Sequence, residues 1–175
     1  MEKNFCKVGF INIKEDDYAV VADPCYDLDS RWIEVVEIKR GMYDCYIEEK
    51  YFGMWGKRVS RLAILKDSFG VEKLNECGEL VNDVAVDSGT MGIYAYHYFA
   101  ETHDNDVDED WYNKFVCSEW SNNYRLCEDG GVISSSGFGD GMYAVYYYRD
   151  DKDNVIGIEV VFIEDDEEKE NEDED

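Results

Sequence analysis

Apolar and polar side chains alternate along much of the chain with the two-residue period of a β-strand. In residues 42–52, Tyr43, Cys45 and Ile47 fall on one face, and the intervening, mostly charged side chains fall on the other. The sequence Gly-Met-Trp-Gly at 53–56 supplies a turn, and residues 57–66 provide a returning strand. The pattern therefore predicts a β-hairpin over residues 42–66.

The end of the chain shows the same pattern. Residues 142–149 and 155–163 predict two strands joined by a polar turn at 150–154. Apolar side chains occupy one face of the second strand, and Glu159 lies on the opposite face. This arrangement predicts that only the apolar face of the strand is buried.

The remaining elements are shorter. Strands are expected at 7–13, at 18–23 (where Pro24 ends the ladder) and at 84–86, with a short helix within 71–80. A helix is expected within 108–120, where Trp111 and Phe115 are four residues apart. Residues 32–38 suit either a strand or one and a half helical turns. The secondary structure of residues 93–100 is ambiguous. The sequence predicts a single domain over residues 1–163, mainly β (α+β), with an antiparallel sheet or sandwich and one or two short helices.

Composition changes this picture in one respect, which is charge. The chain of 175 residues has 42 acidic and 17 basic side chains, a net charge of −25, and aromatic residues make up 15% of it. Residues 164–175 carry ten carboxylates, one lysine and no apolar side chain, so they predict a disordered acidic tail. The body keeps a charge of −16 without this tail. Such a surface repels nucleic acid and anionic membranes, and it attracts cations and basic protein surfaces.

The six cysteines are spread along the chain without a Cys-x-x-Cys pair. An even number is compatible with three disulfides, but no secretory signal is apparent in residues 1–13. Reduced thiols acting as small apolar residues are the favoured interpretation, which predicts a cytoplasmic protein.

Three segments stand out because each places an Asp beside Pro, Ser or Gly next to an apolar strand. They are residues 20–26 (VVADPCY), 84–92 (VAVDSGTMG) and 135–143 (SSGFGDGMY). Together with the final hairpin they resemble an uncharacterised family, number 4241 among the domains of unknown function, in a short, phage-type variant. That family occurs in bacteria and some phages and has no established activity, so the resemblance implies a fold and not a reaction.

These segments give the candidate ligand-binding residues. If Asp23, Asp87 and Asp140 line one cleft, they could hold a divalent cation weakly or share acid and base roles. The alternative is that each Asp accepts backbone hydrogen bonds within a tight turn, where Gly supplies a positive φ. The full set of candidates is Asp23, Cys25, Asp87, Ser88, Ser136, Asp140 and Tyr143.

Other motifs carry less information. The loop at 137–141 leads into a strand and not into a helix, which is unsuitable for a phosphate site. Residues 104–108 imitate the start of an EF-hand, but Glu109 and Phe115 stand where Gly and Glu are required. With only His97 and His103 present, a histidine-based zinc site is not expected, and a carboxylate beside Cys25 disfavours a thiolate nucleophile. The sequence thus predicts no cofactor and no dedicated metal site, with weak binding of a divalent cation left open.

The resulting functional expectation is an acidic binding or inhibitory module that engages a basic protein surface or a small ligand. Direct binding to nucleic acid or membrane is not expected. The alternative is an enzyme, or a metal- or metabolite-binding protein, that uses a loop cleft lined by carboxylates.

Overall fold

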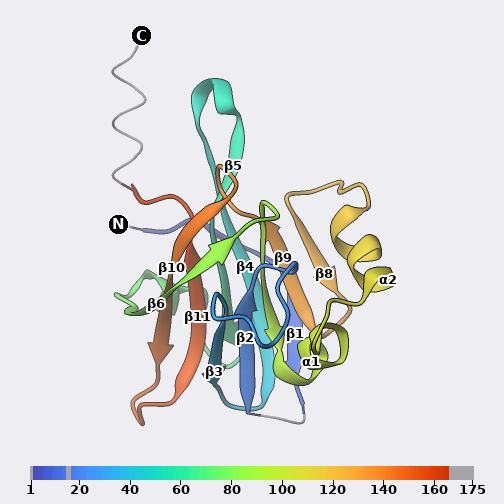
Figure 1. Cartoon of the computed structure of the whole chain (residues 1–175). Helices are drawn as coiled ribbons and strands as arrows, with labels where there is room; N and C mark the ends of the chain where they lie inside the picture. The colour runs from blue at the N-terminus through green and yellow to red at the C-terminus, as the bar shows by residue number, and fades with distance from the viewer. Residues whose placement is uncertain (1, 15–16, 166–175) are drawn as a thin grey trace.

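The protein is built from two antiparallel β-sheets, as seen in a computed structural model that describes residues 2–14 and 17–165. Figure 1 shows the two sheets, with the helices α1 (Tyr96–His103) and α2 (Glu109–Tyr112) gathered on one side. The predicted class, mainly antiparallel β with short helices, is confirmed. In the part of the chain just defined, no helix has the length and apolar content needed to cross a membrane.

The six-stranded sheet has the order β1-β4-β5-β11-β10-β6. Both predicted hairpins, β4–β5 and β10–β11, lie in this sheet, and strand β11 pairs with β5 and joins them. The bounds of its strands are β1 Phe5–Ile13, β4 Gly41–Tyr51, β5 Lys57–Lys66, β6 Glu79–Val86, β10 Gly141–Arg149 and β11 Val155–Val161.

The five-stranded sheet has the order β3-β2-β7-β9-β8. Its strands are β2 Tyr18–Ala22, β3 Glu34–Glu37, β7 Thr90–Ala95, β8 Tyr124–Cys127 and β9 Gly131–Ser135. The segment at 32–38 is thus a strand, and the ambiguous segment at 93–100 divides into the end of β7 and the start of a helix. The helical elements are α1 Tyr96–His103, α2 Glu109–Tyr112, the π-helical turn Asn113–Cys117 and the 3₁₀ turns Gly53–Trp55 and Val71–Asn75.

The main core lies between the two sheets and contains Ile47, Leu62 and Val160 of one sheet, with Ile93 and Val132 of the other. Removal of such side chains from water is the principal favourable term in folding. Each sheet also buries part of its outer face. Helices α1 and α2 cover one, and the segment around the 3₁₀ turn at 71–75 covers the other.

The outer face of β11 corrects one sequence prediction. Glu159, expected to face solvent, is buried and forms ion pairs with Arg61 and Lys3. Every residue of β11 is buried, because residues from the N-terminus and from the 71–75 turn cover the outer face of the sheet. The alternating pattern was interpreted as one buried face, whereas both faces are buried.

The predicted tail boundary also requires correction. Asp165, assigned from the sequence to the acidic tail, binds Lys50 at 2.7 Å and Arg61 at 3.1 Å through its carboxylate. The folded body therefore includes this residue. Residues 166–175, the rest of the predicted tail, lie outside the described residues.

Replacing Asp165 with Ala in the full chain is expected to lower the free energy of unfolding by about 1–2 kcal/mol, because the buried Arg61 and the partly buried Lys50 lose a charged acceptor. Chemical denaturation measures this value. The control is Glu164→Ala, which removes the same charge from the exposed neighbouring residue and should change stability by less than about 0.5 kcal/mol. Equal effects of the two variants would show that Asp165 contributes no more to stability than its exposed neighbour, as expected of a tail residue.

Candidate functional site

The candidate site begins at Asp23, the residue that follows strand β2. Its side chain is fully buried. One carboxylate oxygen accepts hydrogen bonds from the backbone N–H of Cys25 (2.8 Å) and the hydroxyl of Ser88 (2.7 Å). The other accepts from the backbone N–H groups of Asp87 and Ser88, both at 2.7 Å. Since a carboxylate offers about four acceptor positions, these four donors use the capacity of Asp23.

The β6–β7 turn links Asp23 to the third candidate segment. Gly89 of this turn donates its N–H to the carboxylate of Asp140 at 2.9 Å, and its carbonyl oxygen accepts the N–H of Ser136 at 3.1 Å. Asp87 is exposed and accepts a hydrogen bond from the hydroxyl of Tyr26. The three segments therefore converge at one end of the molecule, and two of their carboxylates, Asp87 and Asp140, lie on the surface.

Ser136 and Tyr143 hold the third segment in shape. The Ser136 hydroxyl donates to the carbonyl oxygen of Gly139 at 2.9 Å, and the Tyr143 hydroxyl donates to the same oxygen at 2.6 Å. Gly137 has a φ of +57°, and a Cβ there would lie 3.0 Å from the side chain of Phe162. The loop is thus a tightly closed turn, and these contacts support the structural interpretation of both polar side chains.

Cys25 is poorly suited to nucleophilic chemistry. Burial, together with a hydrogen bond to Asp23 and the charges of Asp23 and Asp87, raises the pKa of its thiol far above the usual range. The thiolate, which is the reactive form, is therefore disfavoured at neutral pH. All six cysteines are free thiols in the structure, in agreement with the expectation of reduced cysteines.

Within residues 2–14 and 17–165, no three His, Cys, Asp or Glu side chains are grouped so that they could hold a metal ion. In the EF-hand-like segment, Asp108 instead accepts the N–H of Trp111 at 2.9 Å and caps helix α2.

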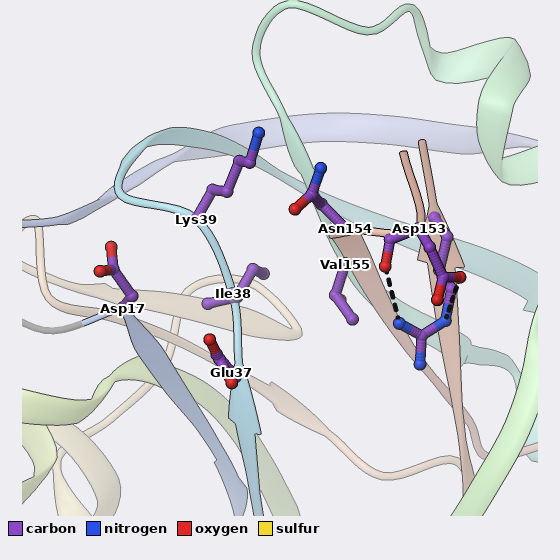
Figure 2. A pocket seen from close by; sticks show the side chains of 8 residues that line it. Asp17, Glu37, Ile38, Lys39, Asp153, Asn154 and Val155 are labelled. Carbon is purple, nitrogen blue, oxygen red and sulfur yellow. Dashed lines mark hydrogen bonds and ion pairs between the residues drawn. The ribbon is translucent and has the colours of Figure 1, made fainter. Parts of the chain in front are cut away.

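A surface concavity of about 440 Å³ lies elsewhere, near the Arg149 end of strand β10. Figure 2 shows Asp17, Glu37 and Lys39 on one side of it and the β10–β11 turn with Asp153 on the other. Arg149 is already bound to Glu79 at 2.8 Å and to the carbonyl oxygen of Asp153 at 3.0 Å. The sequence did not predict this concavity, since its walls come from turns of two different sheets.

A buried histidine anchors helix α1 to the Asp23 segment. Nε2 of His103 lies 2.9 Å from the carbonyl oxygen of Pro24, so this nitrogen carries the proton. Nδ1 lies 2.7 Å from the Thr102 hydroxyl, and the imidazole stacks on Phe99 with ring centroids 4.0 Å apart. Burial lowers the pKa of His103 below its ordinary value of 6.5, against the raising effect of the Pro24 carbonyl.

This lowered pKa predicts a pH dependence of stability. The unfolded chain takes up a proton at His103 near pH 6.5, whereas the folded chain resists it, so stability is lost as the pH falls from 6.5 toward the folded pKa. Urea unfolding at pH 7.5 and pH 5.5 should show a larger loss in the wild-type protein than in His103→Gln, which keeps an N–H donor for Pro24. Equal losses in the two proteins would contradict the prediction.

Comparisons with known proteins add no relatives. The chain matches no protein-family model, no curated protein and no solved structure. The resemblance to the domain of unknown function 4241 remains a prediction, carried only by the segments quoted above. Fold and site define a class: an acidic protein of two antiparallel sheets, whose convergent loops are fixed by a buried aspartate.

Proposed function

We propose that the protein is a binding module that engages a basic surface of another protein. The exposed carboxylates of Asp87 and Asp140, which we call the acidic rim or loop rim, guide the encounter. The observation that carries this proposal is the placement of Asp87 and Asp140, which are exposed on neighbouring loops joined through Gly89. The net charge of −25 adds a long-range field that speeds the approach of a basic partner. Inhibition of a nucleic-acid-binding protein by occupying its phosphate-binding surface is one form of this function.

The alternative of an enzyme, or of a metal or metabolite site, between the three aspartates has less support. Asp23 is one of the three carboxylates predicted to line such a cleft, but it is fully buried and already accepts four hydrogen bonds. The thiol of Cys25 is held in its protonated form by burial and by Asp23. What remains exposed on the rim is negative charge, which suits recognition of a basic surface.

The test compares two double variants of equal net charge. Asp87→Asn with Asp140→Asn removes the rim carboxylates, whereas Glu101→Gln with Asp151→Asn removes two exposed carboxylates elsewhere. Proteins from an extract of the native host are captured on the immobilised wild-type protein at 50 mM salt, identified, and then expressed and purified. We expect basic partners, with association roughly three- to tenfold slower for the rim variant than for the control variant at low salt. Partners that are not basic, or that associate with the wild-type protein at the same rate at 50 and 500 mM salt, would refute the proposal.

A further inference from the structure

The β4–β5 hairpin carries a group of exposed apolar side chains that the loop rim does not explain. Met54 is fully exposed at its turn, and Tyr51 and Trp55 are 77% and 63% exposed. Phe138, from the loop that precedes β10, is 51% exposed and lies beside Trp55. We call Tyr51, Met54, Trp55 and Phe138 the aromatic tip. Figure 1 shows this hairpin reaching beyond the rest of the two sheets.

The aromatic tip is held in a defined shape. Its turn is a 3₁₀ helix at Gly53–Trp55 between residues of positive φ, +49° at Gly53 and +70° at Gly56. Phe52 is buried beneath it, with its ring centroid 5.4 Å from that of Phe138 in an edge-to-face contact. The ring centroid of Trp55 lies 6.2 Å from that of Phe138, also in an edge-to-face contact. Trp55 and Phe138, which these contacts hold in place before binding, therefore lose little entropy when a partner covers them.

Exposed Trp, Tyr and Met side chains on a projecting turn are costly in water, and these residue types are enriched at the centres of protein interfaces. The turn itself needs only its glycines, so its geometry does not account for Met54 and Trp55. A binding role accounts for both side chains.

Charge indicates which kind of partner could cover the aromatic tip. A second copy of this chain would bring another net charge of −25 against the first, and an anionic membrane would be repelled in the same way. Two lysines of the hairpin are neutralised within the protein, Lys57 by Glu49 at 2.8 Å and Lys50 by Asp165 at 2.7 Å. Asp140, two residues after Phe138, brings exposed negative charge to the same loop.

We propose that the aromatic tip inserts into an apolar pocket of a protein partner, and that lysine and arginine side chains border this pocket and face Asp140 and Asp87. This inference rests on the proposed function and assigns it a binding centre. The tip supplies the lifetime of the complex, and the acidic rim supplies its rate of formation and its salt dependence.

The first experiment places a photo-crosslinking benzoylphenylalanine at position 54 of the full chain and exposes it to an extract of the native host. The matched control has the same group at Leu80, an exposed apolar residue of β6. We expect an adduct from position 54 alone, to one protein whose crosslinked segment is apolar and flanked by basic residues. Adducts to lipid or to a second copy of the chain, the same adducts from both positions, or no adduct would overturn the inference.

The second experiment uses the purified partner and three proteins: wild type, the tip variant Met54→Ser with Trp55→Ser, and the rim variant Asp87→Asn with Asp140→Asn. The tip variant should bind at least 100-fold more weakly at both 50 and 500 mM salt, through faster dissociation, with an unchanged melting temperature. The rim variant should lose affinity at low salt only, through slower association. If the tip variant binds like the wild type while the rim variant is impaired, the tip inference fails and the proposed function stands. If only the tip variant is impaired and binding is independent of salt, the proposed function fails.

Discussion

Replacing Arg61 with Ala is expected to lower the free energy of unfolding by about 3–5 kcal/mol, because it leaves buried carboxylates without their cation. Arg61 is 4% exposed on the outer face of the six-stranded sheet. Its guanidinium binds Glu48 and Glu159, each at 2.9 Å, and Asp165 at 3.1 Å. Lys3, 3.0 Å from Glu159, is the second cation of this group. Its single charge cannot replace the guanidinium at Glu48.

Urea unfolding of the full chain measures the effect, with Arg40→Ala as the matched control. Arg40 pairs with Asp17 at 3.1 Å, but both side chains are about half exposed, so its loss should cost less than about 1 kcal/mol. A second variant replaces Arg61, Glu48 and Glu159 together with Met, Leu and Leu. It should recover much of the lost stability, since apolar side chains of similar size often replace a buried ion group without loss. Equal effects of Arg61→Ala and Arg40→Ala would show that the buried charges are solvated.

The same cluster of buried ion pairs shows which part of the fold could not be predicted from the sequence. The hairpins could be predicted, because their strands alternate and their turns contain glycine or a run of polar residues. The burial of Glu159 could not, since Arg61 and Lys3 are 98 and 156 residues away in the sequence. A glutamate opposite an apolar face resembles a solvent-facing residue whenever its partners are remote.

The division of residues 93–100 between strand and helix was hidden for a different reason. Tyrosine and phenylalanine fit both a strand of the five-stranded sheet and the first turn of α1. Helix α1 also begins at Tyr96 after Ala95, whose side chain makes no capping hydrogen bond. At α2 the start signal was present, since Asp108 caps it, and a helix was predicted there.

For the candidate site, the sequence marked three segments that lie together in the structure, whereas the aromatic tip includes a side chain that was not among the candidates. Asp beside Pro, Ser or Gly marked the three loops, and their convergence is seen in the hydrogen bonds of Asp23 and Asp140. Phe138, on the third loop, gave no signal in a sequence that is rich in aromatic residues. Met54 and Trp55, two large apolar residues between the glycines of a hairpin turn, were interpreted only as part of that turn.

Substituting Asp23 by Asn is the second large effect we expect, a loss of about 2–4 kcal/mol in the free energy of unfolding. Asn keeps one acceptor oxygen, and its amide group would place N–H donors against N–H donors of the surrounding backbone. Either the pair at Asp87 and Ser88 or the pair at Cys25 and the Ser88 hydroxyl would lose its acceptor. Buried donors without an acceptor are costly because they have also lost water.

The controls for Asp23→Asn are the same substitution at Asp87 and at Asp140. These two residues are proposed to bind a partner, whereas Asp23 is expected to hold the loops together. Asp140→Asn keeps an oxygen for the N–H of Gly89, and Asp87 is exposed, so each single Asn variant should lose less than about 1 kcal/mol. Hydrogen exchange should locate the damage in Asp23→Asn, with faster exchange either of the amides of Asp87 and Ser88 or of the amide of Cys25, according to which oxygen the amide group replaces. If Asp23→Asn leaves both stability and these exchange rates unchanged, the four hydrogen bonds do not hold the loops together, and Asp23 becomes available again as a ligand-binding carboxylate.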